Sequence, residues 1–232
     1  MQKRLAILLI LVFSTTAAAA IAYDANAAQL SITTTASFTS GSGSNRLLIV
    51  AFTGSNDILT VTYAGVSMAR IGSLGSHSPS FADAWGLLAP ATGANNIAIT
   101  TTGGGARAAF AASYSGVSQT GFPDAVVVDS TSSAPSGDTA WPINITTVAA
   151  NAWIIAIGHM AAGDWGPGGN GTVIAGTSHN AFYHRGPVAS AGATTISIDT
   201  VFSGGTGIAA VAVSFAPSGA AATKVVHRVT QR

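Results

Sequence analysis

The sequence predicts an all-β protein, a two-sheet antiparallel β-sandwich with jelly-roll-like connections. Short runs rich in β-branched and aromatic residues recur at roughly ten-residue intervals between glycine-rich or polar turns. The chain of 232 residues holds 27 glycines and no glutamate, so the usual builders of amphipathic surface helices are scarce. More than ten such runs in one chain are typical of two packed sheets.

A three-strand meander is expected at the centre of the sandwich. Leu47–Phe52 is a continuous apolar run, and Ile58–Tyr63 alternates β-branched residues with threonine. Val66–Ile71 follows Ala64-Gly65, a pair suited to a tight turn or bulge. Gly54–Asp57, between the first two runs, is expected to form a hairpin loop.

The other expected strands share short length, β-branched or aromatic content and flanking turn residues. They are Ile21–Asp24, Leu30–Phe38, Phe81–Leu88, Ile97–Thr101, Ala106–Val117, Val126–Asp129, Ile143–Val148, Trp153–His159, Thr172–Ala175, Phe182–Arg185, Thr194–Asp199 and Gly207–Phe215. An amphipathic helix is the alternative for Ala106–Val117. The sequence GDWGPGGNG, Gly163–Gly171, is expected to be the longest irregular loop, and no repeat of fixed period is evident.

The N-terminal segment, residues 1–20, has the pattern of a secretory signal peptide. Lys3 and Arg4 precede the apolar run Leu5–Phe13, which leads into a stretch of alanines. Small residues suit the −3 and −1 positions of a cleavage site at Ala18 and Ala20, or at Ala20 and Ala22. A retained membrane anchor is the alternative, although the apolar run is shorter than the ~20 residues that a spanning helix needs.

The remaining chain is expected to form one sandwich domain over residues 21–216 and a linker with a basic tail over residues 217–232. With 48% hydrophobic and 7% charged residues, the chain can bury a large core. The last residues, Lys224–Arg232, alternate valine with polar residues and are expected either to add a strand or to be disordered.

Charge and cysteine content exclude several function classes. The net charge is +1 and there is no basic cluster outside the termini, so electrostatic binding of nucleic acid is not expected. The chain has no cysteine, which excludes disulfides, thiolate metal sites and thiol catalysis. No cofactor is expected.

The succession SGSNRLLIVAF, LTVTYAGVSMARIGS, AWGLLAPATGANNIAIT and ARAAFAASYSGVSQT resembles a recurrent jelly-roll-like β-sandwich module of exported bacterial proteins and of phage tail or virion proteins. The match covers most of Ile21–Phe215. The resemblance implies an adhesive or structural role and an extracellular or particle-surface setting. It implies no catalytic residues.

The sequence contains few residues arranged as a catalytic or metal-binding site would require, so we do not expect an enzyme. There is no Gly-x-Ser-x-Gly elbow for a serine hydrolase. All eight acidic residues are aspartates, most of them beside turn formers, and only Asp83 and Asp199 would suit a polysaccharide hydrolase or lyase. His159, Asp164, His179 and His184 are the only candidate metal ligands, and His179 and His184 would face opposite sides of one regular strand.

Carbohydrate binding is the best-supported activity, because sugar rings stack on exposed aromatic faces carried by loops. Trp165 in the glycine-rich stretch is the first candidate. Trp141 before Pro142, and Tyr183 beside His184 and Arg185, are the second candidates, whereas Trp85 and Trp153 are expected in the core.

We therefore expect a secreted or surface-bound, non-enzymatic protein for adhesion or glycan recognition. A structural subunit of a virion, filament or surface layer is the alternative, and the expected partners are a surface glycan or further copies of the chain. Contact with a membrane is expected only through the signal segment, if that segment is retained.

Overall fold

The computed structural model describes residues 19–27, 30, 35–54, 58–77, 80–103, 108–131, 137–138, 140–160, 164–177, 179–202, 207–219 and 228–231. These residues form strands and turns throughout, which confirms the all-β prediction. Within them no helix has the length and apolarity needed to cross a membrane.

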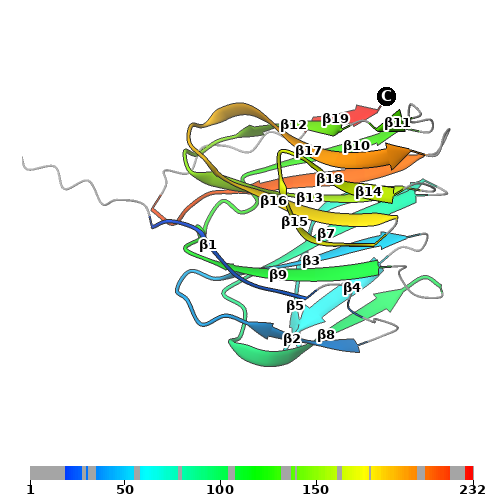
Figure 1. The fold of residues 1–232 in the computed structure, drawn as a ribbon. Coiled ribbons are helices and arrows are strands. Elements are labelled where there is room, and N and C mark those ends of the chain that lie inside the picture. The colour runs from blue at the N-terminus through cyan, green and yellow to red at the C-terminus, as the bar shows by residue number, and fades with distance from the viewer. Residues whose placement is uncertain are drawn as a thin grey trace, which may run out of the picture.

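Four sheets pack face to face in one stack (Figure 1). Outer sheet 1 has the strand order β2 (Thr35–Ser40), β8 (Gly93–Thr101), β4 (Ile58–Tyr63), β5 (Val66–Ser67). Inner sheet 1 has the order β1 (Ala22–Ala27), β9 (Ala108–Ser115), β3 (Leu47–Gly54), β7 (Ser80–Leu88), β6 (Ala69–His77).

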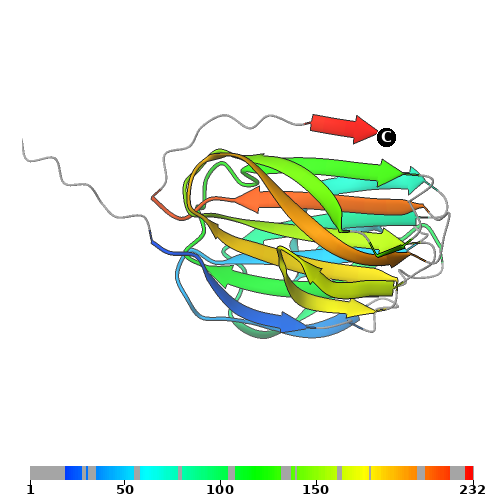
Figure 2. The same ribbon diagram turned by 45° about the horizontal axis from the view of Figure 1, so that its top comes forward.

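Two further sheets complete the stack. Inner sheet 2 has the order β15 (Thr172–Thr177), β16 (Asn180–Val188), β13 (Ala152–Met160), β18 (Ile208–Phe215), β10 (Ala125–Thr131), β19 (Arg228–Gln231). In outer sheet 2, β17 (Gly192–Phe202) pairs with β11 (Gly137–Asp138), β12 (Trp141–Thr147) and β14 (Asp164–Gly169). All pairs are antiparallel except β10 with β19, which Figure 2 shows at the edge of the molecule.

Three apolar cores separate the four layers. The central core joins the two inner sheets and includes Ile49, Phe110, Ile157 and Val211. A second core lies between inner sheet 1 and outer sheet 1, and a third between inner sheet 2 and outer sheet 2. The order of layers is therefore outer sheet 1, inner sheet 1, inner sheet 2, outer sheet 2.

This layering explains the two kinds of hydrophobic pattern in the sequence. Strands of the inner sheets have apolar neighbours on both faces, and β3 and β18 are buried along their whole length. Their sequences, LLIVAFTG and IAAVAVSF, are accordingly almost continuously apolar. Strands of the outer sheets have one solvated face, and β12 alternates exposed and buried residues from Pro142 to Thr147.

The structure corrects three predictions from the sequence. There are four sheets rather than two, and the strand order does not confirm a jelly roll. The meander is wrong, because β3 and β4 belong to different sheets and the third run is divided at Met68 between β5 and β6. Only the tight turn holds: Ala64 and Gly65 have positive φ angles of 50° and 78° and join β4 to β5. The expected loop Gly163–Gly171 contains strand β14.

The molecule consists of two halves with the same topology. Inner sheet 1 and outer sheet 1 form the first half, and the other two sheets form the second. Eight strands correspond in chain order: β1 to β10, β2 to β12, β3 to β13, β4 to β14, β6 to β15, β7 to β16, β8 to β17 and β9 to β18. The registers correspond as well, since Leu47 pairs with Tyr114 as Trp153 pairs with Phe215. The sequence shows no repeat of fixed period that would indicate this duplication.

Candidate functional site

A cavity of about 360 Å³ lies at the end of the molecule where the described chain begins. Its described lining residues are Ala19, Ala20, Ile21, Asn151, Trp153, Pro187 and Pro217, and none of them has a charged side chain. We call it the Trp153 cavity, because Trp153 is the aromatic residue among those described in its lining.

Trp153 is held tightly at the start of β13. A Cβ atom added to Gly186 of the neighbouring strand would lie only 2.3 Å from Cγ of the indole, so glycine at this position lets the backbone pack directly against the ring. Tyr114 and His184 approach the ring edge-to-face, with centroids 5.8 Å and 5.1 Å away. These neighbours fix the orientation of the indole, and part of the ring forms the cavity wall.

The opposite wall comes from the first described residues. The N–H of Ala19 donates to the carbonyl oxygen of Ser218 at 3.1 Å, and the Ile21 side chain is buried in the central core. Gly116 has a φ of 73°, and a Cβ atom there would lie 2.2 Å from the carbonyl oxygen of Ala20. The fold thus accommodates the backbone of residues 19–21 closely.

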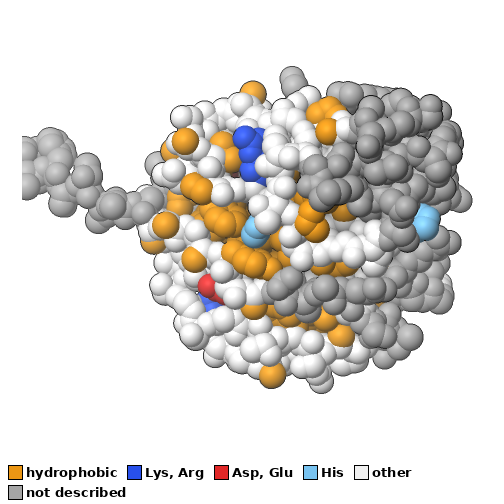
Figure 3. Space-filling model, in the orientation of Figure 1, with side chains coloured by type: hydrophobic (Ala, Val, Ile, Leu, Met, Phe, Trp, Pro, Cys, Tyr) orange, Lys and Arg blue, Asp and Glu red, His pale blue; other side chains and the backbone are white. Residues whose placement is uncertain are grey.

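An aromatic cluster continues from the cavity into the central core. It contains Tyr23 and Tyr114 of the first half, and Trp153 and His184 of the second. The ring of His184 lies edge-on to Tyr23 at 4.8 Å, and its Nδ1 is 3.3 Å from the Tyr114 hydroxyl. Figure 3 shows hydrophobic side chains across the middle of the face, where the two halves meet.

Burial favours the neutral forms of both hydrogen-bonded partners in this cluster. It lowers the pKa of His184, and it raises the pKa of Tyr114 well above the ordinary value of 10.0, with a smaller contribution from Tyr23. The cluster therefore presents uncharged rings at neutral pH, and its chemistry is that of packing and hydrogen bonding.

The residues expected to bind a ligand do not gather at one place. Tyr183 is 1% exposed and belongs to the core between inner sheet 2 and outer sheet 2, so the expectation of an exposed stacking face fails. Arg185 is half-buried and donates to Thr194 Oγ1 and to the carbonyl oxygen of Thr195. Trp141 packs against the same core as Tyr183. Of the expected side chains that the structure describes, His184 is the one that adjoins the Trp153 cavity, through the Trp153 ring.

Trp165 lies in a strand rather than a loop. Its backbone pairs with Thr200 in outer sheet 2, and its side chain lies outside the described part of the structure. Trp85 is buried, as expected, whereas Trp153 is only partly core. Residue type alone does not indicate the Trp153 site, because its cavity is assembled from segments that are far apart in the sequence.

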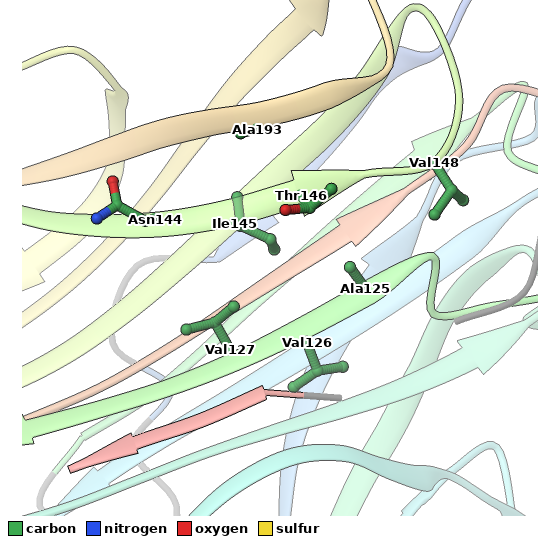
Figure 4. Close-up of a pocket in the computed structure, with 8 residues that line it drawn as sticks. All are labelled: Ala125, Val126, Val127, Asn144, Ile145, Thr146, Val148 and Ala193. Atoms are coloured by element: carbon green, nitrogen blue, oxygen red, sulfur yellow. The ribbon is translucent and has the colours of Figure 1, made fainter. Parts of the chain in front are cut away.

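A second cavity, of about 390 Å³, opens between β10 and β12 (Figure 4). It is lined by Ala125, Val126, Val127, Asn144, Ile145, Thr146, Val148 and Ala193. The corresponding position of the first half carries Phe38, which pairs with Asn95 as Ile145 pairs with Thr194, and Phe38 is buried. The smaller Ile145 leaves space open. None of these described lining residues has an aromatic or titratable side chain.

The carboxylates of Asp83 and Asp124 make contacts that stabilise the fold. Asp83 is fully buried, its Oδ2 lies 3.3 Å from Nη2 of Arg70, and the guanidinium of Arg70 lies 4.9 Å from the centre of the Trp85 ring. Asp124 accepts from the N–H of Val148 at 3.1 Å, and burial raises its pKa against the effect of this hydrogen bond. The Asp199 side chain lies outside the described part.

The candidate metal ligands are dispersed. On β13 and β16, His159 pairs with Asn180 and His184 pairs with Ile155. Along these paired strands His159 and His184 are therefore four residues apart, or ~13 Å. Among the described residues no three potential ligands come together.

No protein-family profile, no curated protein and no solved structure matches this chain. The structure itself therefore establishes the class, an all-β protein of several antiparallel sheets packed as in a sandwich. No match identifies the module that the sequence resembles.

Proposed function

We propose that this chain is an exported, non-catalytic binding protein that takes an uncharged sugar residue of a glycan into the Trp153 cavity. The observation that carries the proposal is the indole of Trp153, fixed by Gly186, Tyr114 and His184 and forming part of an uncharged cavity wall. Aromatic rings favour the apolar faces of sugars, and preorganised rings lose little entropy on binding.

The size and chemistry of the cavity support a small neutral ligand. Its volume of about 360 Å³ lies at the lower end of the range for small-molecule sites. Pro187 and Pro217 add apolar walls, and the exposed side chain of Asn151 supplies an amide that can bind a hydroxyl group. The described side chains of the lining carry no charge that would attract an acidic or basic ligand.

Glycan-array screening followed by calorimetry tests the proposal. Trp153→Phe and Asn151→Gly are suitable variants, because phenylalanine keeps an aromatic ring in the core and glycine keeps the positive φ of 59° at position 151. Each is expected to weaken binding at least about tenfold, or ~1.4 kcal/mol. Trp141→Phe, at a partly buried tryptophan away from the cavity, is the matched control.

Trp165→Ala separates this proposal from the expectation based on the sequence. We expect binding to survive in Trp165→Ala. Loss of binding in that variant, with binding retained in Trp153→Phe, would assign recognition to β14 instead. A complete absence of binding to neutral glycans would reject the proposal.

A structural role is a second candidate, favoured by the parallel pairing of β19 with β10. This pairing shows that the edge of inner sheet 2 accepts an added strand, which is a common mode of association between chains. Light scattering across a concentration range tests it, with a chain ending at Gly219 for comparison. Assemblies that disappear without the C-terminal strand would support this role, and a monomer at all concentrations would reject it.

A further inference from the structure

We infer that the export signal is removed on the N-terminal side of Ala19, so that Ala19, Ala20 and Ile21 remain in the mature protein as a wall of the Trp153 cavity. The inference rests on the export that the proposed function includes. It moves the processing site away from both positions that the alanine pattern first suggests, after Ala20 and after Ala22.

Cleavage after Ala22 would remove part of the folded core. Ile21 is 7% exposed and packs in the central core between the two inner sheets. Ala22 forms the first pair of β1, opposite Ser115. The chain would then begin at Tyr23, and both the buried side chain and the first pair of the strand would be lost.

Cleavage after Ala20 would place a new charged amino group on Ile21, whose side chain is buried. Charged groups are strongly disfavoured next to apolar cores. The same cut would remove the N–H of Ala19 that donates to Ser218, and the Ala20 carbonyl that faces Gly116. These contacts join the start of the described chain to Gly116, which follows β9, and to Ser218, which follows β18.

The fold also shows local adaptation to residues 19 and 20. Gly116 has a φ of 73°, and the Ala20 carbonyl leaves no space for a Cβ atom at this position. Ser218 accepts from Ala19 and donates from its own N–H to the carbonyl of Gly116 at 2.7 Å. A site specific to residues 19 and 20 would have no purpose in a protein that loses them.

A suitable processing site lies immediately upstream. Thr16 and Ala18 place small side chains at −3 and −1 of the Ala18–Ala19 bond, as a signal peptidase requires. Cleavage there leaves Ala19 as the first residue. Its amino group can still donate to Ser218, and the exposed side chains of Ala19 and Ala20 need no burial.

Intact-mass measurement of the exported protein tests the inference. The full chain from Met1 is produced in a secreting bacterial host, and the exported product is collected. A mass that begins at Ala19, or at a residue upstream within the alanine run, supports the inference. A mass that begins at Ile21 or Tyr23 overturns it and leaves the proposed glycan site to be judged separately by binding. An unprocessed chain would reject both this inference and the proposed export.

Ala20→Gln makes the test sharper, because glutamine would occupy −1 of one rejected site and −3 of the other. Processing is expected to continue as in the parent chain, with the substitution retained in the mature mass. The control Ala20→Ser keeps a small residue at both positions. Blocked processing in Ala20→Gln alone would overturn the inference. Chains that begin at Ala19 and at Tyr23 provide a second readout, and the shorter is expected to melt at least about 4 °C lower.

Discussion

Tyr114 and His184 meet across the boundary between the two halves of the molecule, with the Tyr114 hydroxyl 3.3 Å from Nδ1 of His184. Tyr114 belongs to β9 of inner sheet 1 and His184 to β16 of inner sheet 2, and both side chains are buried. The interface that they cross is largely apolar, and a second buried polar contact crosses it where Thr53 Oγ1 donates to Asn180 Oδ1 at 2.6 Å. Because a buried polar group without a partner is costly, each residue stabilises the fold through the other.

Removal of the Tyr114 hydroxyl is expected to weaken the joint between the halves. Tyr114→Phe keeps the ring contacts with Trp153 and Phe215 but leaves His184 without this hydrogen bond. The expected loss is about 1 kcal/mol in the free energy of unfolding, measured by urea denaturation. An unchanged midpoint for Tyr114→Phe would show that the hydrogen bond contributes nothing.

Acidification is expected to destabilise the protein through His184. Burial lowers its pKa in the folded state below the ordinary value of 6.5, so below pH 6.5 the unfolded chain binds more protons than the folded one. Stability therefore falls as the pH drops from 6.5 to the folded-state pKa, and becomes level below it. Melting temperatures from pH 7.5 to pH 5 are compared for the parent chain and His184→Gln. A smaller decrease is expected in the variant, and identical slopes would contradict the assignment.

Gly116 and Gly65 provide a matched pair of glycine substitutions. Both have positive φ angles, 73° and 78°, but only Gly116 faces a backbone atom, since a Cβ atom at Gly65 meets nothing within 4 Å. Gly65→Ala is expected to cost about 1 kcal/mol from the backbone conformation alone. Gly116→Ala adds a clash with the Ala20 carbonyl and is expected to cost several times as much. Thermal denaturation of both variants measures the difference, and equal losses would mean that residue 20 moves aside freely.

Arg70 compensates the buried charge of Asp83. Arg70→Ala leaves the carboxylate of Asp83 in an apolar core, and we expect a loss of about 2 kcal/mol, moderated because Arg70 is 36% exposed. The double variant with Asp83→Asn should lose less than the sum of the two single changes. Urea denaturation of the three variants completes this cycle. Strict additivity would show that the ion pair is not coupled.

The sequence predicts most individual strands but not their assembly into sheets. Strand signals are local, and Leu47–Phe52 and Trp153–His159 coincide closely with β3 and β13. Pairing is non-local: β3 and β4 follow one another in the chain, yet they lie in different layers. The continuous apolar run of β3 carried the missing information, since burial on both faces requires a sheet on either side.

The candidate site is equally hard to predict from the sequence, because it too depends on non-local contacts. Tyr183 lies beside His184 and Arg185 in the sequence, and these polar neighbours favour an exposed position. Because side chains alternate between the two faces of β16, the Tyr183 ring instead points into the core between inner sheet 2 and outer sheet 2. Trp153 has apolar neighbours in the sequence and was expected to be buried. Its cavity arises only when Ala19–Ile21 and Pro217 meet beside it, and those residues are far apart along the chain.

The hydrogen bond between Ala19 and Ser218 has a consequence for protein engineering. It brings the start of β1 and the end of β18 close together, as Figure 1 shows. A short peptide could connect these two points, with new termini opened in the exposed segment between the halves, at Thr120–Gly121. The resulting circular permutant would carry the second half first. If it folds, the four-layer stack depends on the packing between the sheets and does not depend on the order of the two halves along the chain.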